Sequence, residues 1–260
     1  MLLHILGSGT CELRRDRSSP AYLVEAGDTA VLMDLGQGAL RRFLQTGRDP
    51  AGLAGVLLSH HHLDHLADLM PLLFALNYDP HLNRRASLTL VGHAGLARVL
   101  EGLGRVFGSW IQPGPERWQV RLLEPGRQTE LGDIRITTAR ASHMETSLAF
   151  RLERGEASLV YLGDSQYAPE LVELARGAGL LLAHCAAPDH APKPGHLTPA
   201  GAGELASAAG VGMLVLSHLY REVDPQAAVA SAGRAFSGPV LAARDHLELA
   251  WRGRGFETLS

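Results

Sequence analysis

Four side chains that commonly bind metal ions form the pattern H-x-H-x-D-H within six positions: His60, His62, Asp64 and His65. The apolar run Val56-Leu57-Leu58 just before it predicts a buried strand. Alternation along an extended chain places His60 and His62 on one side, and Asp64 and His65 open the next helix from the other side. Imidazole and carboxylate suit Zn²⁺ or a similar ion, and two ions about 3.5–4 Å apart need a shared oxygen ligand. The spacing therefore predicts a two-metal site.

The type of ligand indicates what such a site is for. Sets of histidine and carboxylate leave coordination positions open for catalysis, whereas closed structural zinc sites rely mainly on cysteine. The chain has 13 histidines but only two cysteines, Cys11 and Cys185. A catalytic site is therefore favoured over a structural one. By alternation, His61 should point away from its neighbours and either support them or be exposed.

Three further candidates each follow an apolar run that predicts a strand: His143 after 134–141, Asp164 after 159–162 and His218 after 213–216. Side chains at the ends of several strands converge on one edge of a sheet scaffold. We therefore expect these three to complete the site, with the two oxygens of Asp164 bridging the ions. Six other histidines have no spacing that would pair them with another metal ligand, and we expect them to be ordinary surface or core residues. They are His4, His81, His93, His184, His190 and His246.

Short apolar runs separated by glycine-rich turns predict the elements that position these residues. Strands are expected at 2–6, 21–25, 30–34, 56–58, 87–91, 118–123, 134–139, 148–152, 159–162, 180–183 and 213–216, the first three as a meander. Helices are expected at 38–46, 65–76, 94–103, 169–178, 198–209 and 225–236. Strands and helices alternate in both halves, which predicts one α/β domain over residues 1–260 with αββα layering.

Composition excludes several classes of protein. A chain of 260 residues with 46% hydrophobic residues can bury a large core without disulfides, which excludes a secreted miniprotein. The formal charge of −3 excludes a protein that coats bulk nucleic acid. The N-terminal segment has no basic leader, and no apolar window reaches the roughly eighteen residues of a membrane span. We expect a cytoplasmic protein without membrane association.

On these motifs the sequence resembles the metallo-β-lactamase superfamily, and within it the ribonuclease Z branch. The resemblance covers nearly the whole chain. Its further motifs are Leu6-Gly7-Ser8-Gly9-Thr10, Met33-Asp34-Leu35-Gly36-Gln37-Gly38, Leu162-Gly163-Asp164-Ser165, Gly195-His196-Leu197-Thr198 and Leu216-Ser217-His218. It implies an αββα sandwich of the metallo-β-lactamase type. It also implies a ligand set: His60, His62 and His143 for one ion, Asp64, His65 and His218 for the other, and Asp164 as the bridge.

The same resemblance assigns His196 as the group that protonates a leaving oxygen, beside Asp64 in the catalytic set. The family's glutamate partner for this histidine falls near the start of His184-Cys185-Ala186-Ala187, where Cys185 stands instead, and Asp189 is an alternative partner. The exosite arm that grips tRNA in the branch belongs between His143 and Asp164. Here 164 − 143 leaves 21 positions, which two strands and a turn fill, so the arm is expected to be absent.

Arginines near the expected metal edge are candidates for binding phosphate. Arg14, Arg15 and Arg17 lie in the loop after the first strand, and Arg221 follows His218 by three positions. A guanidinium can hold a phosphate through two parallel hydrogen bonds. The loop resembles the P-x-K-x-R-N loop of the family in charge but lacks its Pro and Asn.

Together these features predict a metal-dependent hydrolase, with a hydroxide bridging two ions as nucleophile. The ions are expected to be Zn²⁺, with Mn²⁺ as an alternative. The expected substrate is a small or short nucleotide or RNA phosphodiester. The alternatives are a tRNA 3′-end-processing endoribonuclease, whose gripping surface is rebuilt elsewhere or supplied by a homodimer partner, a lactone or thioester hydrolase, and a metal-binding protein without activity.

Overall fold

The computed structural model describes residues 1–82, 86–112 and 116–259. The strands are β1 (Leu2–Gly7), β2 (Ala21–Ala26), β3 (Thr29–Met33), β4 (Leu53–Leu58), β5 (Leu88–Gly92), β6 (Trp118–Leu122), β7 (Gln128–Leu131), β8 (Ile134–Arg140), β9 (Leu148–Arg154), β10 (Ala157–Tyr161), β11 (Leu180–His184), β12 (Leu214–Ser217), β13 (Val240–Ala242), β14 (Glu248–Trp251) and β15 (Phe256–Leu259). The α-helices are α1 (Ala39–Gln45), α2 (Leu63–Leu66), α3 (Leu69–Tyr78), α4 (Ala94–Phe107), α5 (Pro169–Ala175), α6 (Pro199–Ala209) and α7 (Pro225–Ala235), and short 3₁₀ turns are η1 (Pro50–Gly52) and η2 (Gly108–Trp110).

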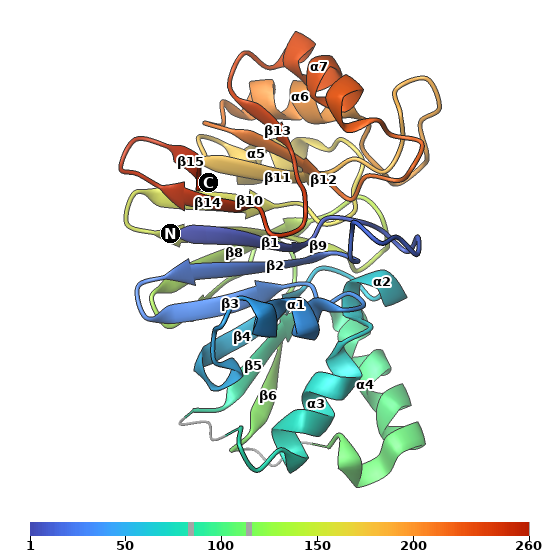
Figure 1. Ribbon diagram of the computed structural model, residues 1–260, viewed down its shortest axis with the longest axis vertical. Helices are drawn as coiled ribbons and strands as arrows, with labels where there is room; N and C mark the ends of the chain where they lie inside the picture. Colours follow the sequence, from blue (N-terminus) through green and yellow to red (C-terminus); the bar gives the residue numbers. More distant parts are fainter. Residues whose placement is uncertain (83–85, 113–115, 260) are drawn as a thin grey trace.

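Within these residues the strands form two sheets (Figure 1). The first has the order β15-β14-β1-β2-β3-β4-β5-β6, and the second has the order β13-β12-β11-β10-β9-β8-β7. The first three strands form an antiparallel meander, as expected. The strands β3, β4, β5 and β6 are parallel, as are β10, β11, β12 and β13.

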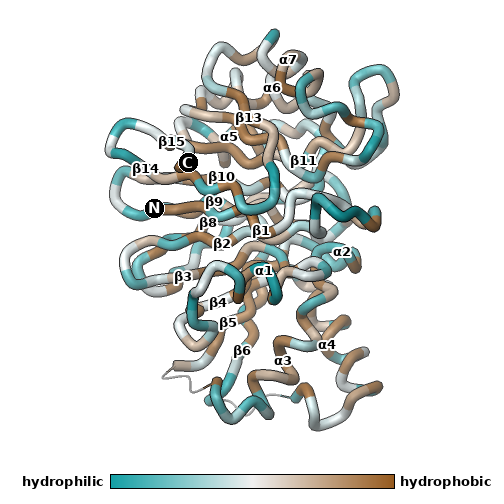
Figure 2. Tube along the Cα trace, viewed as in Figure 1, coloured by the Kyte–Doolittle hydropathy of each residue, from teal (hydrophilic) through white to brown (hydrophobic). Residues whose placement is uncertain are grey.

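Three apolar layers hold the sheets and helices together. Alternation along β2 sends Tyr22 and Val24 into the layer between the sheets, and Leu23 toward the helices that cover the first sheet. Leu181 and Leu205 belong to the third layer, between the second sheet and α5, α6 and α7. Figure 2 shows hydrophobic colours along many of the strands and hydrophilic colours at many of the connecting loops. The arrangement confirms the expected αββα sandwich.

The helix expected over 65–76 is broken into α2 and α3. The loop after β3 causes the break, because the Leu35 N–H donates to the carbonyl oxygen of His65 and the Asp68 N–H donates to the carbonyl oxygen of Leu35. The His65 carbonyl is therefore not available to continue the helix. Asp68 then accepts a hydrogen bond from the Leu40 N–H at the start of α1.

Four strands, β7, β13, β14 and β15, were not expected from the sequence. The hairpin β14–β15 pairs with β1 on the side away from β2 and so forms one edge of the first sheet. These strands are only three or four residues long, and periodicity is a weak signal over so few positions. In the described residues, no helix has both the length and the apolar character needed to cross a membrane.

Candidate metal centre and active site

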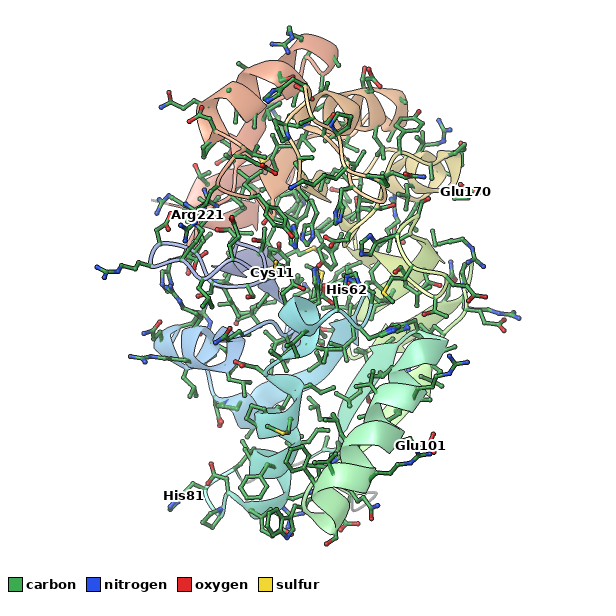
Figure 3. All side chains as sticks on the ribbon, turned by 90° about the vertical axis from the view of Figure 1, so that its right-hand side faces the viewer. Cys11, His62, His81, Glu101, Glu170 and Arg221 are labelled. Atoms are coloured by element: carbon green, nitrogen blue, oxygen red, sulfur yellow. The ribbon has the colours of Figure 1, made fainter. Side chains whose placement is uncertain are left out.

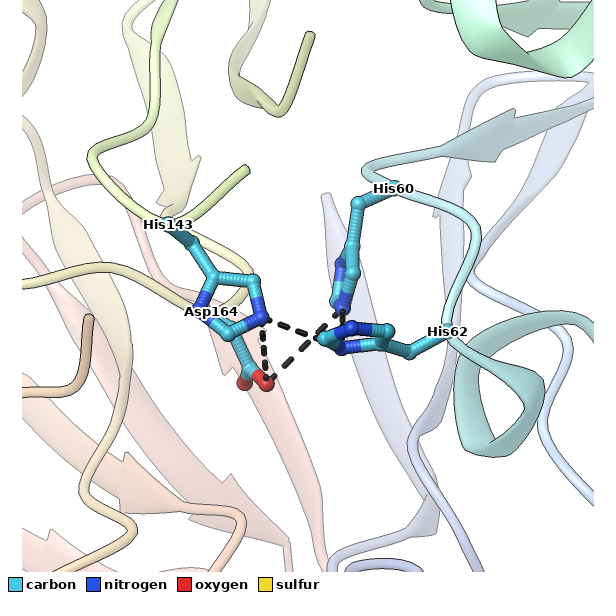
Figure 4. Close-up of side chains that lie close together, drawn as sticks. All are labelled: His60, His62, His143 and Asp164. Atoms are coloured by element: carbon cyan, nitrogen blue, oxygen red, sulfur yellow. Dashed lines mark hydrogen bonds and ion pairs between the residues drawn. The ribbon is translucent and has the colours of Figure 1, made fainter. Parts of the chain in front are cut away.

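One group of polar side chains gathers at the carboxyl ends of β4, β8 and β10. The Nδ1 atom of His62 lies 3.1 Å from Nε2 of His60 and 3.1 Å from Nε2 of His143. Oδ2 of Asp164 lies 3.8 Å from each of these two Nε2 atoms. Figure 4 shows the three rings and the carboxylate directed toward one point. This is the first predicted ligand set, brought together from three separate stretches of chain.

A second group lies on the other side of Asp164. The Nε2 atom of His218 is 3.4 Å from Oδ2 of Asp64 and 3.6 Å from Oδ1 of Asp164. The Nε2 atom of His65 is 3.6 Å from Oδ2 of Asp164 and 3.9 Å from Oδ2 of Asp64. The two oxygens of Asp164 therefore face both groups. The structure thus brings all seven predicted ligands together, with Asp164 between the two sets.

Hydrogen bonds to the far ring nitrogen orient several of these imidazoles. Nδ1 of His65 lies 2.6 Å from Oδ2 of Asp34, and Nδ1 of His143 lies 3.1 Å from the carbonyl oxygen of Gly195. Nδ1 of His60 lies 3.0 Å from the hydroxyl of Ser59, which itself donates to Asp34. Such contacts place the proton on Nδ1 and leave Nε2 free as a ligand atom. In each case Nε2 is the atom that faces Asp164.

Asp34 and His184 are two residues of the site that sequence analysis missed. Nδ1 of His184 lies 2.9 Å from Oδ1 of Asp164, and its Nε2 lies 2.8 Å from the Tyr22 hydroxyl. An ionised carboxylate only accepts, so the Nδ1–H of His184 donates to Asp164 and the Tyr22 O–H donates to Nε2. Both ring nitrogens of His184 form hydrogen bonds, so the ring is held in place and in turn positions the carboxylate of Asp164. The expectation that His184 is an ordinary core residue was wrong.

A signal for both missed residues was present in the sequence. His184 is the last residue of β11, and Asp34 directly follows β3, which is the same position at a strand end that identified the other ligands. Asp34 has a φ of 53°, in the left-handed region, and is fully buried. A buried carboxylate in such a conformation is typical of a functional site.

Divalent ions fit this cluster by the chemistry of its donors. Nε2 of His65 is buried and has no hydrogen-bond partner among the described residues, although two carboxylates flank it. Burial and the charge of His65 hold the pKa of His60 well below its usual value, so its ring is neutral and can bind a metal. Burial alone would raise the pKa of Asp164, but His218 and His65 hold it well below its usual value. The neutral imidazole of His60 and the ionised carboxylate of Asp164 are the ligand states that divalent metals require.

His196 lies at the edge of this cluster. Its Nδ1 is 3.8 Å from Oδ2 of Asp164, and its ring centroid is 4.8 Å from that of His143. This Nδ1 is buried and has no hydrogen-bond partner within the described part of the chain. Asp189 instead accepts from the Ala200 N–H at 2.9 Å and bonds to Ser231 of α7.

Cys185 lies 3.8 Å from the carbonyl oxygen of Thr198 and is fully buried. Burial raises the pKa of its thiol, so it stays protonated at neutral pH. No hydrogen bond or ion pair joins His196 to Cys185 or Asp189 in the described residues. Asp189 holds α6 and α7 together, so neither residue stands in for the family's glutamate in this structure.

The four predicted arginines are placed in different ways. Arg17 is largely buried and donates to the Ser8 hydroxyl at 2.8 Å and to the Ala243 carbonyl at 2.7 Å. Arg14 forms a two-pronged ion pair with Asp16, and Arg221 donates to the Leu13 carbonyl at 2.6 Å. Arg15 is exposed and forms no ion pair or hydrogen bond with the described residues. Arg15 is therefore the arginine of this loop most available to a substrate.

This loop adjoins the His218 side of the centre. The His218 N–H donates to the carbonyl oxygen of Ser8 at 3.1 Å, and Cys11 Sγ lies 3.4 Å from the Tyr220 hydroxyl. A hollow of about 390 Å³ opens here, lined in part by Arg14, Arg15 and Gln37. The arginine loop, which carries Arg14, Arg15 and Arg17 and is the predicted phosphate-binding loop, therefore lies next to the metal centre.

Asp245 holds this loop in place, and replacing it with alanine should destabilise the protein. Its carboxylate accepts from the Ser8 N–H at 2.9 Å and the Ser18 N–H at 2.7 Å, and pairs with Arg42 at 3.1 Å. Asp245→Ala leaves these buried donors unpaired and should lower the free energy of unfolding by about 2–4 kcal/mol. Urea unfolding measures this, with Asp28→Ala in an exposed turn as the control. Equal unfolding midpoints for both variants would contradict the assignment.

Buried neutral histidines should make the metal-free protein sensitive to acid. Burial lowers the pKa values of His93 and His184 to about 4, whereas an unfolded chain titrates near 6.5. As pH falls from about 6.5 to 4, the unfolded chain gains protons that the folded chain does not, so stability falls over this range. The pKa of His65, raised by Asp164 and Asp34 despite burial, opposes part of this loss.

His93→Asn isolates one contribution, because asparagine can still accept from the Gly95 N–H at the start of α4 but does not titrate. Between pH 7.5 and 5.0 the EDTA-treated wild type should lose about 2 kcal/mol more stability than the variant. Denaturant titrations at both pH values measure the difference. The same loss in both proteins would show that His93 does not contribute.

Comparison with known proteins adds an independent observation. A family model described as "Beta-lactamase superfamily domain" matches residues 25–219. A protein named ribonuclease Z from Methanopyrus kandleri is 29% identical, over 95% of this chain and 96% of its own length. The probable metallo-hydrolase YhfI of Bacillus subtilis is 30% identical over 78% of this chain and 81% of its own.

Solved structures show the same fold. The crystal structure of YhfI from Bacillus subtilis has a TM-score of 0.83 and 27% identity, covering 97% of this chain and 98% of that chain. The short form of human tRNase Z has a TM-score of 0.75 and 18% identity, covering 96% and 99%. Both chains are matched along almost their full lengths, so the likeness includes the sheets and helices that position the cluster.

Proposed function

The chain belongs to the metallo-β-lactamase superfamily and is a metal-dependent hydrolase, and we propose that it hydrolyses a small or short nucleotide or RNA phosphodiester. One observation carries the proposal: two imidazole-containing ligand groups share the single carboxylate Asp164 beside a loop with an unpaired arginine, Arg15. A two-ion centre with a cation next to it suits a substrate that bears negative charge on phosphorus.

The roles of the residues follow from their positions. His60, His62 and His143 would hold one divalent ion and Asp64, His65 and His218 the other, with Asp164 shared. When bound, such ions lower the pKa of coordinated water and offset charge that develops at phosphorus. Asp34 and His184 fix the orientation of His65 and Asp164. Arg15 holds a non-bridging oxygen of the phosphate, and His196 carries a proton to the departing oxygen.

A substrate panel tests the reaction class. The protein loaded with Zn²⁺ or Mn²⁺ is assayed with bis(4-nitrophenyl) phosphate, cyclic nucleotides, short RNA, a lactone and a thioester. We expect turnover of phosphodiesters that is lost with EDTA and in Asp64→Ala, and kept in Glu170→Ala, an exposed position on α5. A clear preference for an acyl substrate would overturn the phosphodiester assignment. Absence of turnover on every substrate would favour a metal-binding protein without activity.

The second candidate is tRNA 3′-end processing, favoured by the 29% identity to a ribonuclease Z over nearly the full chain. No arm interrupts the stretch from His143 to Asp164, which are 21 positions apart, and β9 and β10 are joined there by a tight turn at Gly155. A processing enzyme would therefore need another gripping surface. If it uses the arginine loop, Arg15→Glu should lower cleavage of precursor tRNA far more than hydrolysis of bis(4-nitrophenyl) phosphate.

Further expectations belong to the same proposal. We propose Zn²⁺ as the native ion with Mn²⁺ as a substitute, one domain over residues 1–260, a homodimer, and a cytoplasmic location. Metal analysis of protein purified without added metal identifies the ion. Light scattering coupled to size-exclusion chromatography distinguishes a dimer from a monomer.

A further inference from the structure

A second cleft, of about 480 Å³, lies between the start of α4 and the loop that follows His143. Ala94, Arg98 and Val99 of α4 form one wall, Met144 and Glu145 form the other, and His61 lies between them. Its volume is within the range of small-molecule sites in proteins. None of these side chains has a role in the centre described above.

The cleft is coupled to the metal centre through the chain itself. His61 lies between His60 and His62, and Met144 directly follows His143. Adjacent Cα atoms are only about 3.8 Å apart, so residues that bind metal and residues that line the cleft alternate along the same backbone. In Figure 3, His62 lies between α4, which carries the labelled Glu101, and the part of the molecule that carries the labelled Cys11 and Arg221. The cleft and the arginine loop therefore flank the centre on opposite sides.

The floor of the cleft is fixed by a pair of stacked imidazoles. The rings of His61 and His93 are 5.1 Å apart at an interplanar angle of 20°. Nδ1 of His93 accepts from the Gly95 N–H at 3.1 Å and lies 2.9 Å from the Thr146 hydroxyl. A Cβ on Gly95 would come within 2.9 Å of both rings, so only glycine lets the helix approach so closely. His93 is fully buried, and its Nε2 has no partner among the described residues.

The walls carry both signs of charge together with apolar surface. Arg98 and Glu145 are exposed, and neither side chain forms an ion pair or hydrogen bond within the part of the chain that the structure describes. Glu145 would repel a second phosphate, and the first amides of α4 are already used, since the Gly95 and Leu96 N–H groups donate to His93. A flat heterocycle fits better, because its faces match Ala94, Val99 and Met144 while its edge offers both acceptors and donors.

We infer that this cleft binds the nucleobase of the substrate, with the base against His61 and its edge between Arg98 and Glu145. The inference rests on the proposed function, because it places the phosphodiester at the metal centre and the nucleoside on the α4 side. The phosphate then lies between the base cleft and Arg15. The protein is thereby a nucleotide-directed phosphodiesterase, and a diester without a base loses this contact.

Two chromogenic substrates with the same leaving group test the inference on the metal-loaded protein: thymidine 5′-(4-nitrophenyl) phosphate and methyl 4-nitrophenyl phosphate. Ala94→Trp fills the cleft from an exposed helix position, and Ala97→Trp, exposed on the same helix outside the lining, is the matched control. Ala94→Trp should lower kcat/KM for the thymidine ester by about tenfold, the size of one stacking contact, and leave the methyl ester unchanged. Ala97→Trp should change neither value.

The outcomes separate the inference from the function on which it rests. If the wild type hydrolyses both esters and Ala94→Trp slows both equally or neither, the proposal that the cleft binds a base is wrong. The proposed phosphodiesterase function is then retained. If the wild type hydrolyses neither ester, both proposals fail. As a second readout, thymidine 5′-monophosphate should inhibit the wild type more strongly than methyl phosphate, and Arg98→Gln with Glu145→Gln should remove this difference. Equal inhibition by the two compounds in the wild type would also overturn the inference.

Discussion

Replacing Asp164 with alanine should lower kcat/KM by more than about a hundredfold, beyond the range found for residues that only support a ligand. Among the residues that the structure describes, this carboxylate is the one group that faces both ligand sets, at 3.8 Å from Nε2 of His60 and 3.6 Å from Nε2 of His218. Its removal separates the two sets and leaves Nδ1 of His184 without its acceptor. Steady-state kinetics and metal content of the purified variant, measured together, check this result.

Asp34→Asn is the milder variant with which the effect of Asp164→Ala is compared. Asp34 acts on the centre through Nδ1 of His65 and, by way of the Ser59 hydroxyl, on the ring of His60. The variant should lose about 10- to 100-fold in metal affinity or activity, less than Asp164→Ala, and excess metal should restore part of the activity. If Asp164→Ala keeps two ions and near-normal kinetics while Asp34→Asn does not, the placement of Asp164 between the ions is wrong.

His196→Ala should lower kcat by about 10²- to 10⁴-fold for a dinucleotide, whose leaving alkoxide needs a proton. Burial lowers the pKa of His196 to about 4, so its ring is neutral in the free protein at pH 7. The anionic substrate must raise this pKa before the ring can carry the proton. We expect the wild type to show a fall in kcat toward high pH with dinucleotides, and the variant should lose it.

The leaving group separates proton donation from a structural role. Bis(4-nitrophenyl) phosphate releases 4-nitrophenolate, which needs no proton, so His196→Ala should slow this substrate far less. His190→Ala, an exposed histidine of the same loop, is the matched control and should leave both substrates unchanged. Equal losses on the two substrates would mean that His196 orients the centre instead of donating a proton.

Most of the site could be predicted because its residues share a position in the fold. His60, His143 and Asp164 follow apolar strands, and the strand ends of both sheets meet at one edge. His184 obeys the same rule, but it was set aside because no second ligand lies near it in sequence. Its partner Tyr22 is 162 positions away, a contact that only the packing of the two sheets creates.

The arginine loop shows where residue type is an incomplete guide. Arg15 and Arg17 are equivalent in sequence, yet Arg17 is buried against Ser8 and Ala243 while Arg15 is exposed. The difference depends on Asp245, more than two hundred positions away, which organises the loop. The break between α2 and α3 has the same origin, since Leu35 takes a carbonyl that the local pattern assigns to a helix. Long-range hydrogen bonds of this kind leave no periodic signal.

Anomalous diffraction from crystals grown with Zn²⁺ tests the central claim most directly. The account predicts two peaks that share Asp164, one among His60, His62 and His143 and the other among Asp64, His65 and His218. A single peak, or zinc bound elsewhere, would contradict it.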